Sequence, residues 1–99
     1  MKKKYHITLD SLIQRDPEMI FSDMDGETVV MSIDNGEYYG LNQVGSTIWE
    51  LLEKPITVKT MVSELMNKFN VSQKQCEEDV LLFLNTLYEK KLVQIINES

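Results

Sequence analysis

Two residues of this chain could carry out distinctive chemistry, His6 and Cys76, and each is the single residue of its type among 99. A zinc site needs three or four ligands, so one imidazole and one thiol among scattered carboxylates do not form its signature. We expect His6 to be solvated in an N-terminal arm. Cys76 shares one helical face with Val80 and Leu84, which predicts a buried and unreactive thiol.

Neighbouring carboxylates are the other candidates, because a pair of carboxyl groups can act as general acid and general base. Asp23 and Asp25 form one pair, and the Glu-Glu-Asp run at residues 77–79 forms another group. The first belongs to a turn, and the second lies at a helix N-terminus, where acidic residues are stabilising. The sequence contains no nucleophile elbow, phosphate-binding loop or dinucleotide-binding glycine motif. We therefore predict no catalytic residue, no metal site, no cofactor and no enzyme activity.

Composition and charge restrict the remaining classes. Hydrophobic residues make up 42% and charged residues 26% of the chain, as in an ordinary globular domain. The net charge is −6, without the basic patch of a nucleic-acid-binding protein. A single cysteine excludes an internal disulfide and fits a reducing compartment. No apolar run approaches the ~20 residues that span a bilayer, and the basic N-terminus is not a signal peptide. We expect a cytoplasmic protein that binds neither membranes nor nucleic acid.

Residues 37–52 join two periodicities, and the rest of the chain is organised around them. Residues 37–41 have the aromatic character of a strand. Asn42 is typical of a helix N-cap, and the helix that it begins has Trp49 beside an apolar stripe. The stripe consists of Val44, Ile48, Leu51 and Leu52. Gly45 weakens helix propensity, and its missing side chain allows a strand or a second helix to approach closely.

Residues 19–41 predict a three-stranded antiparallel meander, beginning with a short strand at 19–21. Asp25–Gly26 and Asn35–Gly36 are typical of two-residue hairpin turns, which fix the register of the strands. Side chains of the middle strand alternate between faces. One face carries Val29, Met31 and Ile33, and the other carries Thr28, Val30 and Ser32.

Three helices follow the meander in this prediction. Pro55 ends the first helix and Thr57 caps the second. Ser72 caps the third, with Gln75 in the position that completes a capping box. The apolar stripe of the second helix consists of Met61, Val62, Leu65, Met66 and Phe69.

These elements predict one domain over residues 1–99. It has an N-terminal arm (1–18), the meander (19–41), three helices (42–90) and a tail (91–99). The expected fold class is α+β and winged-helix-like: a three-stranded antiparallel N-terminal sheet is followed by three helices, and a layer of helices covers one sheet face.

Adjacent tyrosines distinguish the last strand of the meander. Tyr38 and Tyr39 point to opposite faces, so one covers the core and the other faces solvent or a partner. The strand is also a terminal strand, and neither proline nor lysine blunts its edge. An open edge of this kind invites an added strand from another chain. Alternatively, residues 5–9 or residues 92–96 cover this edge. The pattern favours neither the open nor the covered arrangement.

Leu82 is the second surface feature. It lies well off the apolar stripe of the third helix, between Asp79 and Thr86. One exposed leucine is ordinary. A flank of Asp79, Leu82 and Thr86 beside an open strand edge would, however, form a groove of the size of a peptide.

Two motifs, in this order and at this spacing, resemble the PqqD-like family. The first is Tyr-Gly-Leu-Asn-Gln-Val-Gly at residues 39–45, followed by an amphipathic helix. The second is Asp79-Val80-x-x-Phe83-Leu84-x-x-Leu87, followed by Lys91-Leu92-Val93. The resemblance covers roughly residues 19–96. It departs from the family at Lys91, where glycine is usual.

The resemblance implies a recognition element for precursors of ribosomally synthesised and post-translationally modified peptides (RiPPs). Such domains bind the leader segment of the precursor as an added strand and present it to a separate modifying enzyme. Free-standing members of about this length typically serve lasso peptide pathways, where the partner is a transglutaminase-like leader peptidase. Others serve radical SAM enzymes. The implied partners are therefore a leader peptide and a modifying enzyme.

The resemblance also places leader-binding residues on the matching positions of this chain. On the strand they are Glu37, Tyr38, Tyr39, Gly40 and Leu41. On the third helix they are Asp79, Leu82, Phe83 and Thr86. Aromatic anchors such as Tyr39 are the expected hot spots. Asn42 and Gly45 match the motif as well, with structural roles.

Two other functions share features with this one. A winged-helix nucleic-acid-binding domain has the same order of helices, although the acidic balance argues against it. A small oligomerisation module would pair the open edge with a second copy. We accordingly expect a monomer or a weak edge-to-edge dimer.

Overall fold

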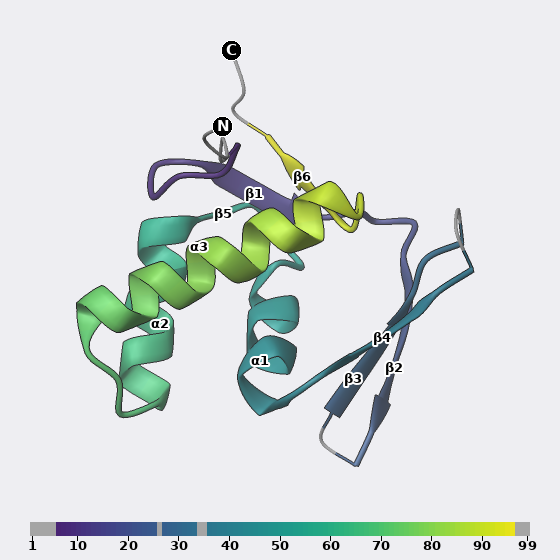
Figure 1. The fold of residues 1–99 in the computed structure, drawn as a ribbon, viewed down its shortest axis with the longest axis horizontal. Helices are drawn as coiled ribbons and strands as arrows, with labels where there is room; N and C mark the ends of the chain where they lie inside the picture. Colours follow the sequence, from purple (N-terminus) through teal and green to yellow (C-terminus); the bar gives the residue numbers. More distant parts are fainter. Residues whose placement is uncertain (1–5, 26, 34–35, 97–99) are drawn as a thin grey trace, which may run out of the picture.

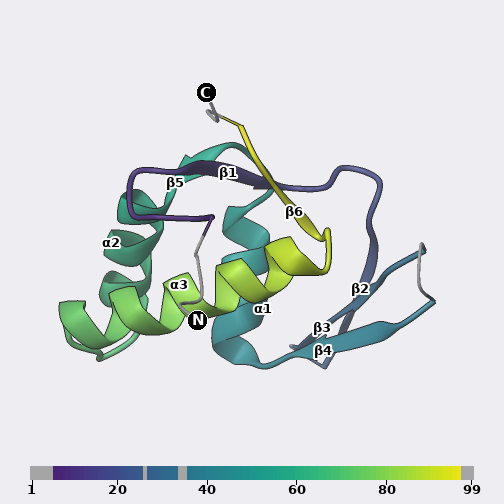
Figure 2. The same cartoon turned by 45° about the horizontal axis from the view of Figure 1, so that its top comes forward.

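The computed structural model describes residues 6–25, 27–33 and 36–96, which form two small sheets and three helices (Figure 1). The strands are β1 (Leu12–Arg15), β2 (Ile20–Met24), β3 (Glu27–Met31), β4 (Tyr38–Leu41), β5 (Ile56–Thr57) and β6 (Val93–Ile95). The helices are α1 (Gln43–Leu51), α2 (Val58–Lys68) and α3 (Gln73–Glu89). The two sheets lie at opposite ends of α1, as Figures 1 and 2 show.

The predicted fold class is confirmed: an antiparallel meander, β2–β3–β4, precedes three helices in an α+β arrangement. The second sheet, in the order β5–β1–β6, is absent from the prediction. Its central strand lies within the predicted N-terminal arm, and β6 lies within the predicted tail. These strands are two to four residues long and pair only with segments distant in sequence. Local patterns do not predict pairings of this kind for that reason.

β6 decides where the tail lies. It pairs antiparallel with β1, with Gln14 opposite Gln94. Just after β6, the Ile96 N–H donates to the Leu12 carbonyl at 2.7 Å. The tail therefore completes the β1 sheet and does not cover β4.

The first hairpin has the predicted two-residue loop, although its first strand begins and ends later than predicted, at Ile20 and Met24. Met24 lies opposite Glu27, and Asp25 between them has a φ of 55°. Gly26, the second residue of the predicted turn, lies outside the described residues.

The register of the second hairpin differs from the prediction. A two-residue turn at residues 35–36 would pair the residues that flank it. Instead, the Ser32 N–H donates to the Glu37 carbonyl at 2.9 Å, and the Gly36 N–H donates to the Ser32 carbonyl at 2.8 Å. Gly36 has the positive φ of 70° that suits a turn, whereas Asn35 lies outside the described residues. The loop is longer by two residues, so every side chain keeps its predicted face.

The meander buries the more polar face of its middle strand. Thr28, Val30 and Ser32 are at most 2% exposed, whereas Ile33 is 60% exposed. Polar groups on the buried face have partners: the Thr28 hydroxyl donates to Asp23 Oδ1 at 3.1 Å. The alternation predicts two faces, but only the packing of α1 on β3 shows which of them is buried.

All three predicted N-caps are confirmed. The side chains of Asn42, Thr57 and Ser72 each accept the backbone N–H three residues further on, at 2.8, 3.2 and 3.3 Å. The predicted capping box of α3 is only half formed, because the Gln75 amide donates forward to Asp79 at 2.9 Å. In the described part of the chain, no helix is long and apolar enough to cross a membrane.

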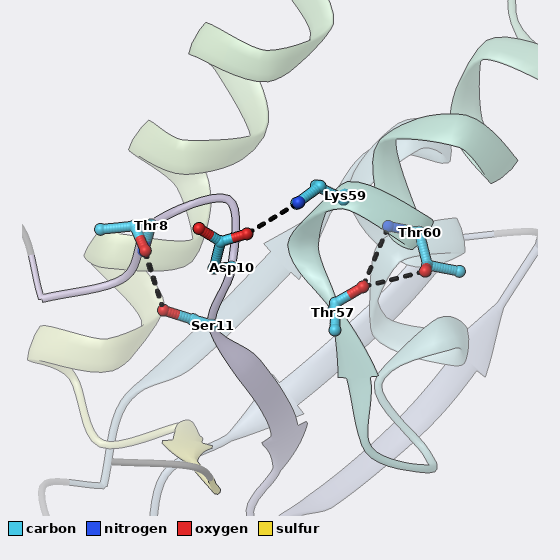
Figure 3. A network of polar contacts seen from close by, with 6 residues as sticks. All are labelled: Thr8, Asp10, Ser11, Thr57, Lys59 and Thr60. Carbon is cyan, nitrogen blue, oxygen red and sulfur yellow. Dashed lines mark hydrogen bonds and ion pairs between the residues drawn. The ribbon is translucent and has the colours of Figure 1, made fainter. Parts of the chain in front are cut away.

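Polar contacts join the N-terminal turn to the start of α2 (Figure 3). The Asp10 carboxylate lies 2.8 Å from Lys59 Nζ, and the hydroxyls of Thr8 and Ser11 lie 3.5 Å apart. The hydrogen bond and the charge of Asp10 raise the pKa of Lys59. Both charged side chains are largely exposed, so the ion pair contributes little to stability. The Lys59 N–H also donates to the Leu9 carbonyl at 3.1 Å, which anchors the turn through the backbone.

Trp49 lies at the centre of the core, with 1% of its surface exposed. Phe21 of β2 meets its ring edge-on at 5.9 Å between centroids. The Arg15 guanidinium of β1 lies 4.5 Å from the Phe21 centroid and 5.5 Å from the Trp49 ring, and it donates to the Trp49 carbonyl at 2.8 Å. α1 is thereby tied to both sheets. Val44 and Met66, which we expected in buried stripes, are instead 40% and 36% exposed, because they lie at the rims of their helices' packing faces.

One buried amide holds the N-terminal segment against α3. Asn85 is 5% exposed, and its Oδ1 accepts the N–H groups of His6 and Ile7 at 3.0 Å each. Its Nδ2 donates to the carbonyls of Ile7 and Leu81 at 3.2 and 2.8 Å. The His6 side chain is exposed, as expected, and its ring lies 5.1 Å from that of Tyr88. This segment is a strap across α3.

Candidate functional site

β4 is a terminal strand of the meander. It pairs with β3 on one side, and no described strand pairs with its other side. Neither segment that could have covered it does so, because residues 92–96 lie beside β1 and residues 6–7 lie against α3. Tyr5 lies outside the described residues. The described structure therefore leaves this edge open, which decides between the two arrangements that the sequence pattern did not distinguish.

Alternation along the ladder decides which β4 groups point toward the open side. Because the Ser32 N–H donates to the Glu37 carbonyl, Tyr39, two residues further on, also turns its backbone groups toward β3. Tyr38 and Gly40 turn theirs the other way. A strand added to β4 would therefore bond to the N–H and C=O groups of these two residues.

Ser46 joins the last rung of this ladder to α1. Thr28 lies opposite Leu41, and the Ser46 hydroxyl sits between their backbones. It accepts the Thr28 N–H at 2.8 Å and donates to the Leu41 carbonyl at 3.2 Å. Its side chain is 7% exposed. One hydroxyl therefore holds the register of β4 and the position of α1 beside it.

We expect Ser46→Ala to lower the free energy of unfolding by about 1–3 kcal/mol, because it deprives a buried N–H and a buried C=O of their partner. Urea denaturation followed by circular dichroism measures this loss. Thr47→Ala is the matched control, since the neighbouring hydroxyl donates to the Gln43 carbonyl on an exposed surface. Equal destabilisation by the two variants would contradict the bridging role of Ser46.

The adjacent tyrosines take opposite faces, as predicted. Tyr38 is 70% exposed on the face turned away from the helices. Tyr39 is half-buried and packs against the core. Its hydroxyl donates to Glu37 Oε1 at 2.6 Å, and Lys90 Nζ lies 5.1 Å from its ring centroid. Tyr39 thus lies between β4 and the C-terminal end of α3.

A cavity of about 360 Å³ opens between the first turn of α1 and α3. Its lining residues are Asn42, Val44, Gly45, Ile48, Asp79, Val80 and Phe83. Gly45 permits this packing, because a Cβ there would lie 3.4 Å from Phe83 Cζ and 3.3 Å from Leu41 Cβ. The close approach predicted for Gly45 is confirmed.

A smaller cavity, of about 120 Å³, continues from the first toward the turn between α2 and α3. The two share Val44, Asp79 and Val80. The smaller one adds Leu65, Phe69, Val71 and Cys76. Together they form an apolar depression at the point where β4 leads into α1, bordered by a single carboxylate.

Opposite charges lie at the two ends of the α3 surface that extends from the cavities to Tyr39. Asp79 borders both cavities, and Lys90 lies over Tyr39. These two residues are eleven positions apart, roughly 16 Å along a helix at 1.5 Å per residue. That length matches about five residues of extended peptide at 3.3 Å each.

Cys76 is 5% exposed, as predicted for a structural thiol. Burial raises its pKa, and the carboxylates of Asp79 and Glu77 raise it further. A thiol with a raised pKa stays protonated at neutral pH and is not an activated nucleophile. Among the described residues, no group of three or more His, Cys, Asp or Glu side chains could hold a metal ion.

The structure gathers part of the predicted helix-side set around the cavity. Asp79 and Phe83 line it. Leu82 is 54% exposed on the adjacent flank, and the exposed Thr86 donates its hydroxyl to the Leu82 carbonyl at 2.9 Å. Neither lines the two cavities. On the strand side Leu41 is 6% exposed and belongs to the core, whereas Glu37 and Gly40 are exposed.

Sequence reasoning missed two residues of this surface, Val44 and Lys90. Val44 fits an apolar stripe by spacing, and nothing in the sequence shows that the first turn of α1 extends past the core. Lys90 could have been found from the sequence, because it follows Asp79 by eleven residues, which is close to three full helical turns. Both residues therefore lie on one face of α3.

Comparisons with known proteins agree with this architecture. No curated protein sequence matches the chain. A solved structure described as TbiB1 in complex with the TbiA(beta) leader peptide is similar, with a TM-score of 0.77 and 28% identity over 86% of this chain and 99% of that chain. The family model for coenzyme PQQ synthesis protein D (PqqD) matches residues 27–93, from β3 to β6. The resemblance noted from the motifs is thereby confirmed, and the chain belongs to the PqqD family.

Proposed function

We propose that this protein binds the leader segment of a ribosomally synthesised precursor peptide by strand addition to β4 and presents it to a separate modifying enzyme. The observation that carries the proposal is an open sheet edge beside an apolar depression, in a chain similar to a protein solved with a leader peptide. Strand addition to an exposed edge is a general mode of peptide recognition.

The leader would hydrogen-bond to the backbone groups that Tyr38 and Gly40 turn toward the open side. These bonds supply affinity with little dependence on sequence, and side-chain contacts supply the choice of peptide. The proposed contact residues on β4 and just before it are Glu37, Tyr38, Tyr39, Gly40 and Leu41. On α3 they are Asp79, Leu82, Phe83 and Thr86.

In this proposal the chain recognises a peptide and performs no catalysis. The protonated, buried Cys76 supports this assignment, because it lacks the activation that a nucleophile needs. The chemistry belongs to a partner in the cytoplasm. A transglutaminase-like leader peptidase of a lasso peptide pathway is the first candidate, and a radical SAM enzyme is the second.

Leu82→Ala tests the helix side of the site. Leu82 is 54% exposed in the peptide-free protein, and a leader lying beside α3 would cover it. Burial of such a side chain contributes about 1–2 kcal/mol, so the dissociation constant should rise roughly tenfold. Fluorescence anisotropy with a labelled leader peptide, taken from a lasso peptide precursor identified by inspecting the genomic neighbourhood, measures the change.

Ile96→Ala is the matched control, because Ile96 is 42% exposed but lies next to β6 in the other sheet. It should bind the leader as the wild type does, and both variants should keep a native circular dichroism spectrum. If Leu82→Ala binds normally, the groove does not run along this flank of α3. If the wild type binds no leader, the proposed function is wrong.

A further inference from the structure

The outer face of the β2–β3–β4 sheet, which is turned away from the helices, is unusually apolar. It is defined here by the residues whose side chains alternate away from the buried face. They are Ile20, Ser22 and Met24 on β2; Glu27, Val29, Met31 and the following Ile33 on β3; and Tyr38 and Gly40 on β4. Glu27, at one corner, is the single charged residue of this set.

The large apolar side chains of the outer face form a continuous row. Ile20 lies opposite Met31, and Met31 lies opposite Tyr38, so one row crosses all three strands. Ile20, Met24 and Tyr38 are 49%, 61% and 70% exposed. Single exposed apolar residues are ordinary, whereas a contiguous exposed group marks an interaction surface.

The two faces of this sheet depart from the usual distribution, although the inner face also buries Val30 and Leu41. An antiparallel sheet with one solvated face normally buries apolar residues and exposes polar ones. Here Thr28 and Ser32 are buried on the inner face, with 2% of each exposed, while the outer face carries large apolar side chains. Solvent alone does not account for that distribution, which indicates that a partner covers the outer face.

We infer that the outer face is the docking surface for the modifying enzyme, through an uncharged apolar surface on that enzyme. This inference rests on the proposed function. A leader added to β4 becomes the fourth strand of the same sheet, and every second leader side chain then joins the outer face beside Tyr38 and Gly40. The surface is therefore continuous with the bound peptide. An enzyme bound to the outer face would contact this protein and the leader peptide at the same time.

Charge favours this occupant over the two alternatives. The chain has a net charge of −6, which opposes close association of two copies and contact with an anionic lipid surface. Glu27 is the one charge on the outer face, so a second copy would find no cation there to offset the repulsion.

The double variant I20K/M24K tests the inference. Both residues lie on β2, separated by β3 from the strand that would receive the leader. Both are about half exposed or more, so folding should be little affected. We expect a leader dissociation constant within about twofold of the wild type. The transglutaminase-like leader peptidase proposed above as the partner should bind the leader-loaded variant at least tenfold more weakly than the leader-loaded wild type, measured by biolayer interferometry.

Ile96→Lys is the control, because it adds a cation at an exposed apolar residue outside this face, and it should bind both partners normally. Undiminished enzyme binding by I20K/M24K overturns the inference, as does a wild-type leader complex that binds no enzyme. A wild-type dimer that I20K/M24K dissociates in sedimentation assigns the face to a second copy. If the wild type floats with phosphatidylcholine vesicles and I20K/M24K does not, the outer face binds lipid. Either of these two results overturns the inference. Leader binding by the wild type is measured before the enzyme is added. If the wild type binds no leader, the proposed function itself is wrong.

Discussion

Replacing Gly40 by proline is expected to weaken leader binding by about 1–3 kcal/mol, or roughly 5- to 150-fold, because it removes a backbone N–H that β4 turns toward the added strand. The fold should survive this change, since proline is tolerated in a terminal strand where the lost N–H faces outward. Isothermal titration calorimetry with the leader peptide measures the effect, and circular dichroism verifies the fold.

Gly40→Ala is the matched control. It keeps the N–H, and a Cβ at this position meets nothing within 4 Å, so leader affinity should stay close to that of the wild type. Tyr39→Pro provides a contrast, because its N–H points toward β3 and its loss should disrupt the sheet itself. If folded Gly40→Pro and Gly40→Ala bind the leader equally well, the peptide does not add to β4.

Asn85→Ala is expected to have the largest effect on stability, lowering the free energy of unfolding by about 2–4 kcal/mol. The amide is 5% exposed and uses both its oxygen and its nitrogen to hold the backbone of His6 and Ile7 against α3. Alanine would leave these buried groups without their partner. Urea denaturation gives the change in unfolding free energy, and calorimetry should show a lower Tm.

Asn67→Ala is the control for Asn85→Ala, because Asn67 lies on the exposed side of α2. A helix favours alanine over asparagine at such a position, so this variant should be as stable as the wild type or slightly more stable. If the unfolding curve of Asn85→Ala coincides with that of the wild type, the packing of the N-terminal strap does not depend on the Asn85 amide. Leader binding below the unfolding transition should be unaffected, since Asn85 contacts neither β4 nor the cavities.

The caps and the meander could be predicted because their causes are local. Asn42, Thr57 and Ser72 each bond to a backbone N–H three residues away, and Asp25 adopts the positive φ that its turn requires. The second hairpin could not be predicted in the same way. Its Asn–Gly pair favours a two-residue turn, but a buried hydroxyl from α1, that of Ser46, bridges Thr28 and Leu41 in a different register.

The candidate site was predictable only in part. The motif around Tyr39 and the spacing of Asp79 and Phe83 locate a strand and a helix face. Val44 was assigned to the core because helical spacing does not show where the core ends, and the structure leaves it 40% exposed at the rim of both cavities. Which tyrosine faces outward also required the packed sheet, since alternation says only that the two differ.

The sequence by itself determined the type and order of the main elements, the three helix starts, a terminal strand with adjacent tyrosines and the family motifs. Short-range hydrogen bonding and residue spacing suffice for all of these. Only the tertiary structure decided that β6 pairs with β1, that the meander buries Thr28 and Ser32 while exposing Ile20 and Tyr38, and that Gly40 points its backbone outward. These features depend on contacts between segments far apart in the chain, whose energies no local pattern records.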